Sequence, residues 1–142
     1  MTNYFDEKKQ MITIIRALDR HITQIFEKRT DVSFTRFEIL AALQCQGIVT
    51  QKDLQQTLAI DQAAVTRHLK MLEQQESIER KRNEKNNREV LVAITEKGMA
   101  LLQDCTIFKD VLMDELYEGF AEDDVQQFKQ YLLRLYENTL KQ

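Results

Sequence analysis

Hydrophobic positions recur along most of this chain with the three- to four-residue spacing of an α-helix. Residues 6–29 carry such a stripe with charges on the other faces, which predicts one long amphipathic helix. After a polar break at residues 30–34, Thr35 is expected to cap a second helix, with Glu38 at the capping-box position. Gly47 is expected just past the end of that helix, because glycine adopts a left-handed backbone at low cost.

Two short helices joined by a tight turn are predicted next. Thr50 is expected to cap the third helix, and the turn at residues 59–60 leads to Asp61 as the cap of a fourth. The fourth helix runs from Gln62 to about Gln74 and has an apolar stripe at helical spacing. The residues expected to be buried in this stripe are Val65, Leu69 and Leu72.

The pattern then changes to that of a β-hairpin. Residues 78–82 and 89–94 are predicted to be antiparallel strands, and the polar segment 83–88 joins them with Asn86-Asn87 as the turn pair. Ile48 and Val49 predict a very short strand that pairs with this hairpin. Two helices, a turn and a hairpin form a winged helix-turn-helix, which lays one helix in the major groove of DNA.

Two further helices are predicted at the C-terminal end. Thr95 is expected to cap one that runs from about residue 96 to 117, Gly119 interrupts the pattern, and the other covers about residues 123–140. Together with the first helix they present more amphipathic surface than one small winged domain can cover, which indicates a helical dimer interface. A two-fold dimer would hold two recognition helices about 34 Å apart, one turn of DNA.

The expected fold class is therefore mainly α with a small β-hairpin wing, a winged helix-turn-helix flanked by N- and C-terminal dimerisation helices. We expect a single domain over residues 1–142. Residues 35–95 would form the DNA-binding region, and residues 6–29 and 96–142 the helical dimerisation region.

Composition and charge agree with this class. The chain of 142 residues has no proline and three glycines, which favours long helices. No apolar run is long enough to cross a bilayer and the first ten residues lack the apolar core of a signal peptide, so a cytoplasmic protein is expected. The net charge is −3, but residues 80–88 hold five basic and one acidic residue, whereas residues 96–142 hold five basic and ten acidic ones. This distribution predicts one positive edge on an acidic body.

The face of the fourth helix that is turned away from its apolar stripe carries side chains suited to DNA. Arginine can form bidentate hydrogen bonds with guanine, and glutamine can do so with adenine. Threonine and alanine can contact the methyl group of thymine, and a lysine near the end of the helix can contact a phosphate. The alternative is an ordinary solvated helix face. The candidate DNA contacts on this helix are Gln62, Ala63, Thr66, Arg67 and Lys70. His68 lies between the two faces and is expected to be partly buried and hydrogen-bonded within the protein.

The hairpin supplies a second group of cationic candidates. Arg80 and Arg82 share one face of the first strand, and Lys85 and Arg88 lie at or near the tip. A positive tip beside a recognition helix can reach backbone phosphates or the minor groove. The alternative is a charged hairpin that only keeps the protein soluble.

Other kinds of site have little support in the sequence. Cys45 and Cys105 form no metal-like cluster and are expected to be free, small, buried residues on helices. No nucleophile, base and orienting group stand at a recognisable spacing, and there is no glycine-rich phosphate loop. An enzyme, a metal site and a cofactor are therefore not expected.

Five short segments, in this order and spacing, resemble the MarR (multiple antibiotic resistance regulator) family over nearly the whole chain. They are residues 35–40 (TRFEIL), 53–60, 64–67 (AVTR) with Leu72-Glu73, 78–80 (IER) and 94–98 (ITEKG). The resemblance implies a homodimer paired by the first, fifth and sixth helices. It also implies that the fourth helix reads the major groove of a near-palindromic double-stranded operator and that the wing enters the flanking minor groove.

The resemblance further implies a repressor, because members of the family usually repress. Many release DNA when a small phenolic or lipophilic ligand binds. Phe26 and Phe37 are the candidate effector contacts, with an ordinary role in the core as the alternative. Other members sense oxidants through a cysteine near the N-terminus, where this chain has none. A thiol-based sensor and a winged helix that binds proteins, such as an antirepressor or scaffold, are the rival functions.

Two departures from the family pattern concern the wing. The family usually has Asp-Arg-Arg where this chain has Asn86-Asn87-Arg88, so Arg88 is the expected wing-tip contact, with Asn87 beside it. The missing aspartate puts the usual salt bridge that braces the tip in doubt. Glu76-Ser77 stand where the family favours glycine, so a left-handed residue at that point would be a strained non-glycine.

Overall fold

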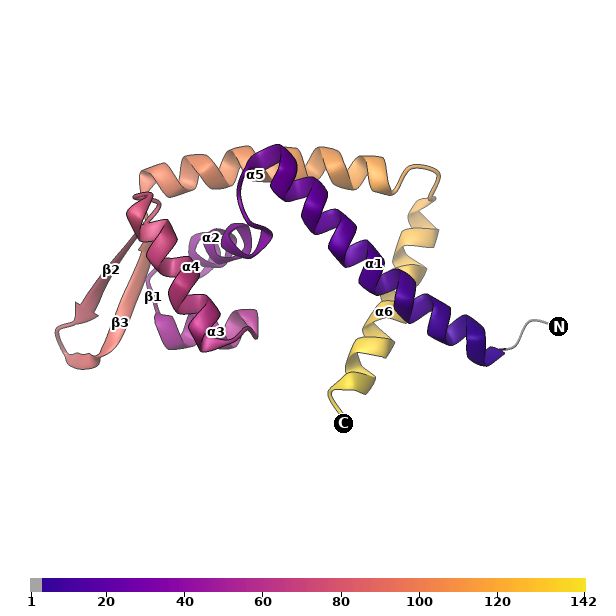
Figure 1. Cartoon of the computed structure of the whole chain (residues 1–142), viewed down its shortest axis with the longest axis horizontal. Helices are drawn as coiled ribbons and strands as arrows, with labels where there is room; N and C mark the ends of the chain where they lie inside the picture. Colours follow the sequence, from indigo (N-terminus) through magenta and orange to yellow (C-terminus); the bar gives the residue numbers. More distant parts are fainter. Residues whose placement is uncertain (1–3) are drawn as a thin grey trace. The chain divides into compact units, whose positions relative to one another are not determined.

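The computed structural model describes residues 4–142, and it contains six helices and a three-stranded sheet in that part of the chain (Figure 1). The helices are α1 (Tyr4–Thr30), α2 (Phe34–Gln46), α3 (Gln51–Leu58), α4 (Gln62–Gln74), α5 (Glu96–Leu116) and α6 (Glu122–Thr139). The strands are β1 (Val49–Thr50), β2 (Ile78–Asn83) and β3 (Asn86–Ile94). The predicted fold class, mainly α with a small β-hairpin wing, is confirmed.

The chain forms two compact units with a boundary inside α5. The first unit runs to Phe108, and the second comprises Lys109–Gln142. The predicted arrangement, a single domain with a DNA-binding region and a helical dimerisation region, stays a prediction. None of the described helices is long and apolar enough to pass through a membrane.

The core of the first unit forms around the apolar stripe of α4, as the spacing predicted. Val65, Leu69 and Leu72 are completely buried and belong to one cluster with residues of α2, α3 and β3. Burial of three such side chains stabilises the fold by roughly 5–9 kcal/mol relative to leaving them in water. The same packing turns the opposite face of α4 to solvent.

The sheet has the strand order β1-β3-β2, and both pairs are antiparallel. The short strand predicted at Ile48 and Val49 is observed one residue later, where Val49 pairs with Val92. Val92 is completely buried, because β3 is the central strand and its inner face packs against the helices. Through this pairing, β1 connects the start of the helix-turn-helix to the hairpin of β2 and β3.

The predicted start of the second helix is wrong by two residues. Ser33, rather than Thr35, is the N-cap of α2, and its hydroxyl accepts a hydrogen bond from the Arg36 amide at 3.0 Å. Asp31, with φ of 58°, ends α1 and turns the chain within three residues, so the hydroxyl at the new helix start is that of Ser33. Gly47 follows α2 with φ of 76°, as expected.

The expectation of buried cysteines holds for Cys105 only. Cys105 is buried on α5, whereas Cys45 is exposed in the last turn of α2. Gln44 and Gln46 on either side of Cys45 are also exposed, so this end of α2 lies at the surface.

A tight junction connects the end of α4 with the start of α5. The chain leaves α4 through two hydrogen bonds, from the Glu76 amide to the Glu73 carbonyl and from the Ser77 amide to the Leu72 carbonyl, at 3.0 and 2.9 Å. This is the Schellman pattern, in which glycine usually occupies the left-handed position. Glu76 holds that position here with φ of 61°, so the expected strained non-glycine is present.

Thr95 completes this junction from the other side. Its amide donates to the Ser77 carbonyl at 3.1 Å, and its hydroxyl donates to the Glu76 carbonyl at 2.7 Å. The same hydroxyl accepts from the Gly98 amide at 3.1 Å and so caps α5. A Cβ at Gly98 would overlap the Ser77 carbonyl oxygen, so the close approach requires glycine.

The left-handed Glu76 predicts a stabilising substitution. Glu76→Gly is expected to raise the free energy of unfolding by about 0.5–1 kcal/mol, because relief of the strain exceeds the added entropy of the unfolded chain. Urea unfolding at fixed protein concentration, with an unchanged slope, measures this.

Glu76→Ala is the matched control. It keeps the Cβ and removes only the exposed ion pair with Lys97 at 3.7 Å, so we expect a change below about 0.5 kcal/mol. If the glycine variant is no more stable than the alanine variant, the left-handed backbone is not the source of strain.

Candidate nucleic-acid interface

The outer face of α4 holds all five candidates that the sequence assigned to it. They are exposed and lie on the side away from the buried stripe: Gln62, Ala63, Thr66, Arg67 and Lys70. Asp61 occupies the N-cap position, but its side chain makes no capping hydrogen bond. The first turn of α4 therefore keeps free backbone N–H groups that can donate hydrogen bonds to a phosphate.

The hydroxyl of Thr66 is already engaged within the protein. It donates to the Gln62 carbonyl at 2.9 Å and accepts from the Gln51 side-chain amide at 3.0 Å. The methyl group of Thr66 is thus the part best placed to meet a base. The hydrogen bond from Gln51 also joins α3 to the exposed face of α4.

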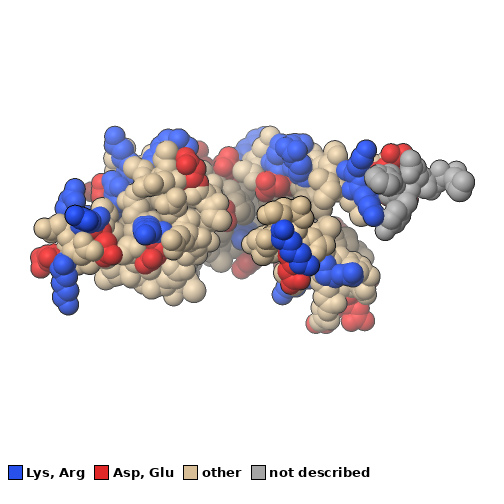
Figure 2. All heavy atoms as spheres, turned by 90° about the horizontal axis from the view of Figure 1, so that it is seen from below, with Lys and Arg blue, Asp and Glu red and all other residues tan. Residues whose placement is uncertain are grey.

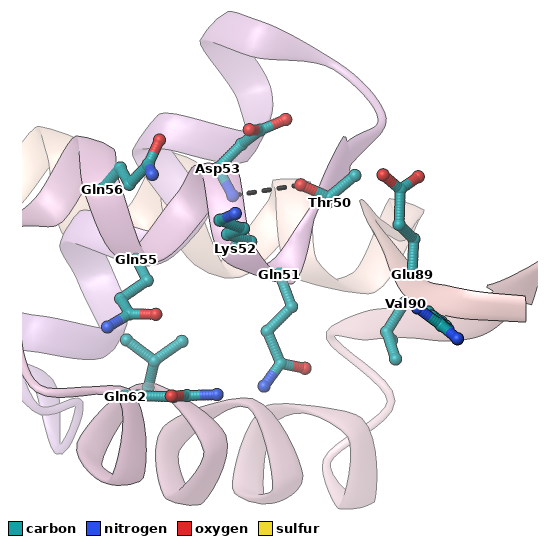
Figure 3. A pocket seen from close by; sticks show the side chains of 11 residues that line it. Thr50, Gln51, Lys52, Asp53, Gln55, Gln56, Gln62, Glu89 and Val90 are labelled. Carbon is teal, nitrogen blue, oxygen red and sulfur yellow. Dashed lines mark hydrogen bonds between the residues drawn. The ribbon is translucent and has the colours of Figure 1, made fainter. Parts of the chain in front are cut away.

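A groove of about 660 Å³ runs between α3, the start of α4 and the wing. Figure 3 shows Gln51 and Gln55 extending from α3 towards Gln62, with Glu89 and Val90 on the β3 side. Lys52 and Arg88 also line it. The sequence reading missed Gln51, Lys52 and Gln55, although the i, i+4 spacing of the two glutamines, on a helix whose inward residue is Leu54, was a usable signal.

Arg80 connects the wing to the recognition helix. Its Nε and Nη2 atoms donate to the two carboxylate oxygens of Glu73 at 3.2 and 3.1 Å. The hydrogen bonds from Arg80 hold the pKa of Glu73 below its usual value. Because the pair is partly exposed, it stabilises the fold by no more than about 1 kcal/mol, and it joins β2 to the last turn of α4.

The wing tip differs from the expected turn. The two strands are joined by Glu84 and Lys85, and Asn86 already belongs to β3, so the predicted Asn86-Asn87 turn pair is wrong. Arg82 donates to the Asn87 carbonyl at 2.7 Å. Arg82, Lys85, Asn87 and Arg88 are all exposed in this part of the wing.

Lys and Arg side chains project at the wing end of the first unit, interleaved with a few carboxylates (Figure 2). The wing sequence explains this, because residues 80–88 carry a net charge of +4. The predicted positive edge is therefore a property of the hairpin rather than of the whole chain.

His68 is partly buried, as expected, but the expected hydrogen bond is wrong for one of its nitrogens. Its Nδ1 atom is buried and has no hydrogen-bond partner among the residues that the structure describes. Burial lowers the pKa of His68, and the positive charges of Arg36 and Arg67 lower it further, while the carboxylate of Glu27 opposes the shift. The neutral ring is thus the form that suits the folded protein.

The two effector candidates lie in the core. Phe26 is completely buried, Phe37 is nearly so, and their ring centroids are 5.1 Å apart. Phe34 and Phe108 extend this aromatic cluster, and the Arg29 guanidinium lies over the Phe108 ring at 5.4 Å. This packing gives both residues a structural role; their contact with an effector stays a prediction.

Comparison with known proteins identifies the family. The sequence model of the MarR family matches residues 32–90, which include α2, α3, α4 and most of the wing. MarR, the multiple antibiotic resistance protein of Salmonella typhimurium, is 33% identical over 105 residues, which cover 73% of this chain and 72% of the relative. The chain belongs to the MarR family. The resemblance to the MarR family that the sequence predicted is therefore confirmed, and the protein is a transcriptional regulator of that family.

Two further comparisons agree with membership of the MarR family. An organic hydroperoxide resistance transcriptional regulator of Bacillus subtilis is 29% identical over 148 residues, covering 100% of this chain and 99% of the relative. A crystal structure of a MarR mutant from E. coli complexed with operator DNA has a TM-score of 0.83 and 24% identity, and covers 94% of this chain and 99% of the other. At that identity the structural match shows the shared fold.

The lowered pKa of His68 predicts how the stability of this MarR-family protein depends on pH. The unfolded chain binds a proton to His68 more readily than the folded chain, so stability is lost as the pH falls below about 6.5. His68→Gln should lose less stability than the wild type between pH 7.5 and 5.5, measured by thermal unfolding at fixed protein concentration.

His21→Gln, a substitution at an exposed histidine of α1, is the control and should keep the wild-type dependence. An identical loss in the wild type and His68→Gln would show that the partly buried imidazole of His68 does not govern stability in this pH range.

Proposed function

We propose that this protein is a cytoplasmic, homodimeric repressor that binds a near-palindromic double-stranded operator and is released by a small phenolic or lipophilic ligand. In this proposal it acts by binding rather than by catalysis. The observation that carries it is the exposed face of α4, where Gln62, Arg67 and Lys70 stand beside a cationic wing. The operator complex of the MarR structural relative supports the same partner.

In the proposed complex α4 enters the major groove. Arg67 reads a base, the methyl group of Thr66 meets a thymine, and Lys70 contacts a phosphate. Ala63 permits a close approach because its side chain is small. Gln62 and Gln51 adjoin each other across the groove between α3 and α4, so Gln51 is a further candidate for base contact.

The wing supplies the backbone contacts of the proposal. Lys85 and Arg88 are exposed at and near the tip, where they can reach phosphates or the minor groove. Arg80 is engaged by Glu73 in the DNA-free protein, so it is a weaker candidate than the sequence suggested.

Exposed apolar surface supports the proposed dimer. On α1, Met11, Ile14 and Leu18 are each more than two-fifths exposed although they share one helix face. Within the second unit, α6 separately exposes a large apolar set: Phe128, Tyr131, Leu133, Leu135 and Tyr136. Such surface is uncommon on a monomer and is typical of subunit interfaces.

A thiol-based oxidant sensor is the rival, because one relative is an organic hydroperoxide resistance regulator. Burial raises the pKa of Cys105, and the nearby charge of Asp104 adds to the shift. A raised pKa reduces the thiolate that reacts with peroxides. The buried thiol of Cys105 is therefore poorly suited to sense oxidants, and Cys45 is the exposed thiol that the rival function would need.

Replacement of Arg67 tests the base-reading part of the proposal. We expect Arg67→Ala to weaken binding to the preferred operator by about 1–3 kcal/mol and to relax sequence preference, because a bidentate hydrogen bond to a guanine would be lost. The operator is first recovered by selection from a random pool, and variant sites are then compared by gel shift.

Lys141→Ala removes an exposed charge far along the sequence from the wing and is the matched control. An equal loss of affinity for every sequence would contradict base reading by Arg67. A wild-type protein that selects no sequence would contradict the proposed function itself.

The rival function, a thiol-based oxidant sensor, predicts that peroxide changes operator binding. We expect mild peroxide to leave operator binding unchanged in the wild type, Cys45→Ser and Cys105→Ser proteins. An oxidant-dependent loss of binding that disappears in either serine variant would establish thiol sensing instead.

A further inference from the structure

We propose that Arg82 is a positioning residue that holds the wing tip in shape, and that Lys85 and Arg88 make the contacts with DNA there. This inference rests on the proposed DNA-binding function. It assigns to Arg82 a role different from the phosphate contact that its charge suggests.

The strand register shows why the tip needs a brace. Pairing of β2 with β3 is regular from Ile78↔Ile94 to Arg82↔Val90, and then shifts to Asn83↔Asn86. Residues 87–89 are left as a bulge in β3 between these two pairs. A bulge of this length has few ladder hydrogen bonds of its own, so other contacts must fix its path.

Arg82 supplies the central contact of this brace. Its Nη1 atom donates to the Asn87 carbonyl at 2.7 Å, which is the short distance typical of a charge-assisted hydrogen bond. Beside it, the Asn83 side-chain amide donates to the Glu89 carboxylate at 3.1 Å. These two bonds join β2 to both ends of the bulge.

Two asparagine side chains fix the backbone at the cationic residues. The Lys85 amide donates to the Asn83 side-chain carbonyl at 3.1 Å, and the Arg88 amide donates to the Asn86 side-chain carbonyl at 3.2 Å. Both are Asx turns, in which a side chain takes the place of a backbone acceptor. Neither Glu84 nor Lys85 has a positive φ, so the turn does not use the left-handed geometry common in two-residue hairpin loops.

The side chains of Lys85 and Arg88 are the ones left available by this arrangement. In the part of the chain described, neither makes a side-chain hydrogen bond or ion pair. Arg82, in contrast, is held by its bond to Asn87. A tip that is ordered before binding loses less conformational entropy when it meets DNA, so Arg82 would raise affinity without touching the phosphates.

A mutant cycle in the full chain separates positioning from contact. Arg82→Ala should weaken binding to the selected operator roughly three- to tenfold, with the dependence of affinity on salt unchanged. Arg88→Ala should lower the salt slope by about 1, because one phosphate contact is lost. In a Lys85→Ala/Arg88→Ala background, Arg82→Ala should cost less than about twofold, because nothing remains for it to position.

Arg82→Met keeps most of the aliphatic stem and serves if the alanine variant is poorly folded. NMR relaxation of the DNA-free protein gives an independent readout, because the Arg88 amide should become more mobile in either Arg82 variant and stay unchanged in Lys85→Ala.

Equal losses in both backgrounds, together with a salt slope that falls by about 1 for Arg82→Ala, would overturn the inference and assign Arg82 to a phosphate. An unchanged Arg88 amide would overturn the brace. A wild-type protein without operator binding would overturn the proposed function and the contact role with it, whereas the first two outcomes leave that function standing.

Discussion

The carbonyl groups of Glu76 and Ser77 hold the start of α5 against the end of α4, and the geometry of the wing depends on this contact. Both receive hydrogen bonds from Thr95, which follows the last residue of β3, while β2 begins directly after Ser77. The two ends of the hairpin are thus fixed to each other, and the pairing Ile78↔Ile94 follows from that constraint. The left-handed Glu76 persists because these bonds, together with the close approach of Gly98, over-determine the backbone.

This junction also fixes the wing relative to the recognition helix. α4 ends in the turn that starts β2, and the Arg80–Glu73 pair joins the same two elements one turn further out. On the other side, the bond from Gln51 to Thr66 fixes α3 against α4. The surfaces that would meet a major groove and a neighbouring backbone are therefore linked to each other within the first unit. In the proposed operator complex, specificity depends on the side chains that these linked elements present.

Sequence periodicity predicted the helices well because each one carries its apolar positions as a stripe, and α4 buries its stripe in the core through Val65, Leu69 and Leu72. The errors occur where a contact between distant or competing groups decides the outcome. Thr35 and Ser33 can both cap a helix in isolation, and the turn at Asp31 selects Ser33. The Asn86-Asn87 pair suits a turn, but the chain turns at Glu84 and Lys85, where the Lys85 amide donates to the Asn83 side chain, and Asn86 pairs with Asn83 in the ladder. The i, i+4 spacing of Gln51 and Gln55 marked an outer face of α3, but the bond from Gln51 to Thr66 could not be predicted, because the two residues lie on different helices.

The wing also explains how an acidic chain can suit DNA without a broad basic surface. Asn83 and Asn86 hold the Lys85 and Arg88 amides through neutral hydrogen bonds, and among the described residues the side chains of Lys85 and Arg88 form no ion pair, so their positive charges stay available. The brace contains no ion pair, because Arg82 donates to a backbone carbonyl and the Glu89 carboxylate accepts from an amide; screening by salt weakens such bonds less than exposed charge pairs. The shape of the tip should then persist at ionic strengths at which its phosphate contacts weaken. The dependence of DNA affinity on salt concentration would then come only from the cationic side chains, while the path of the tip along the DNA would stay the same.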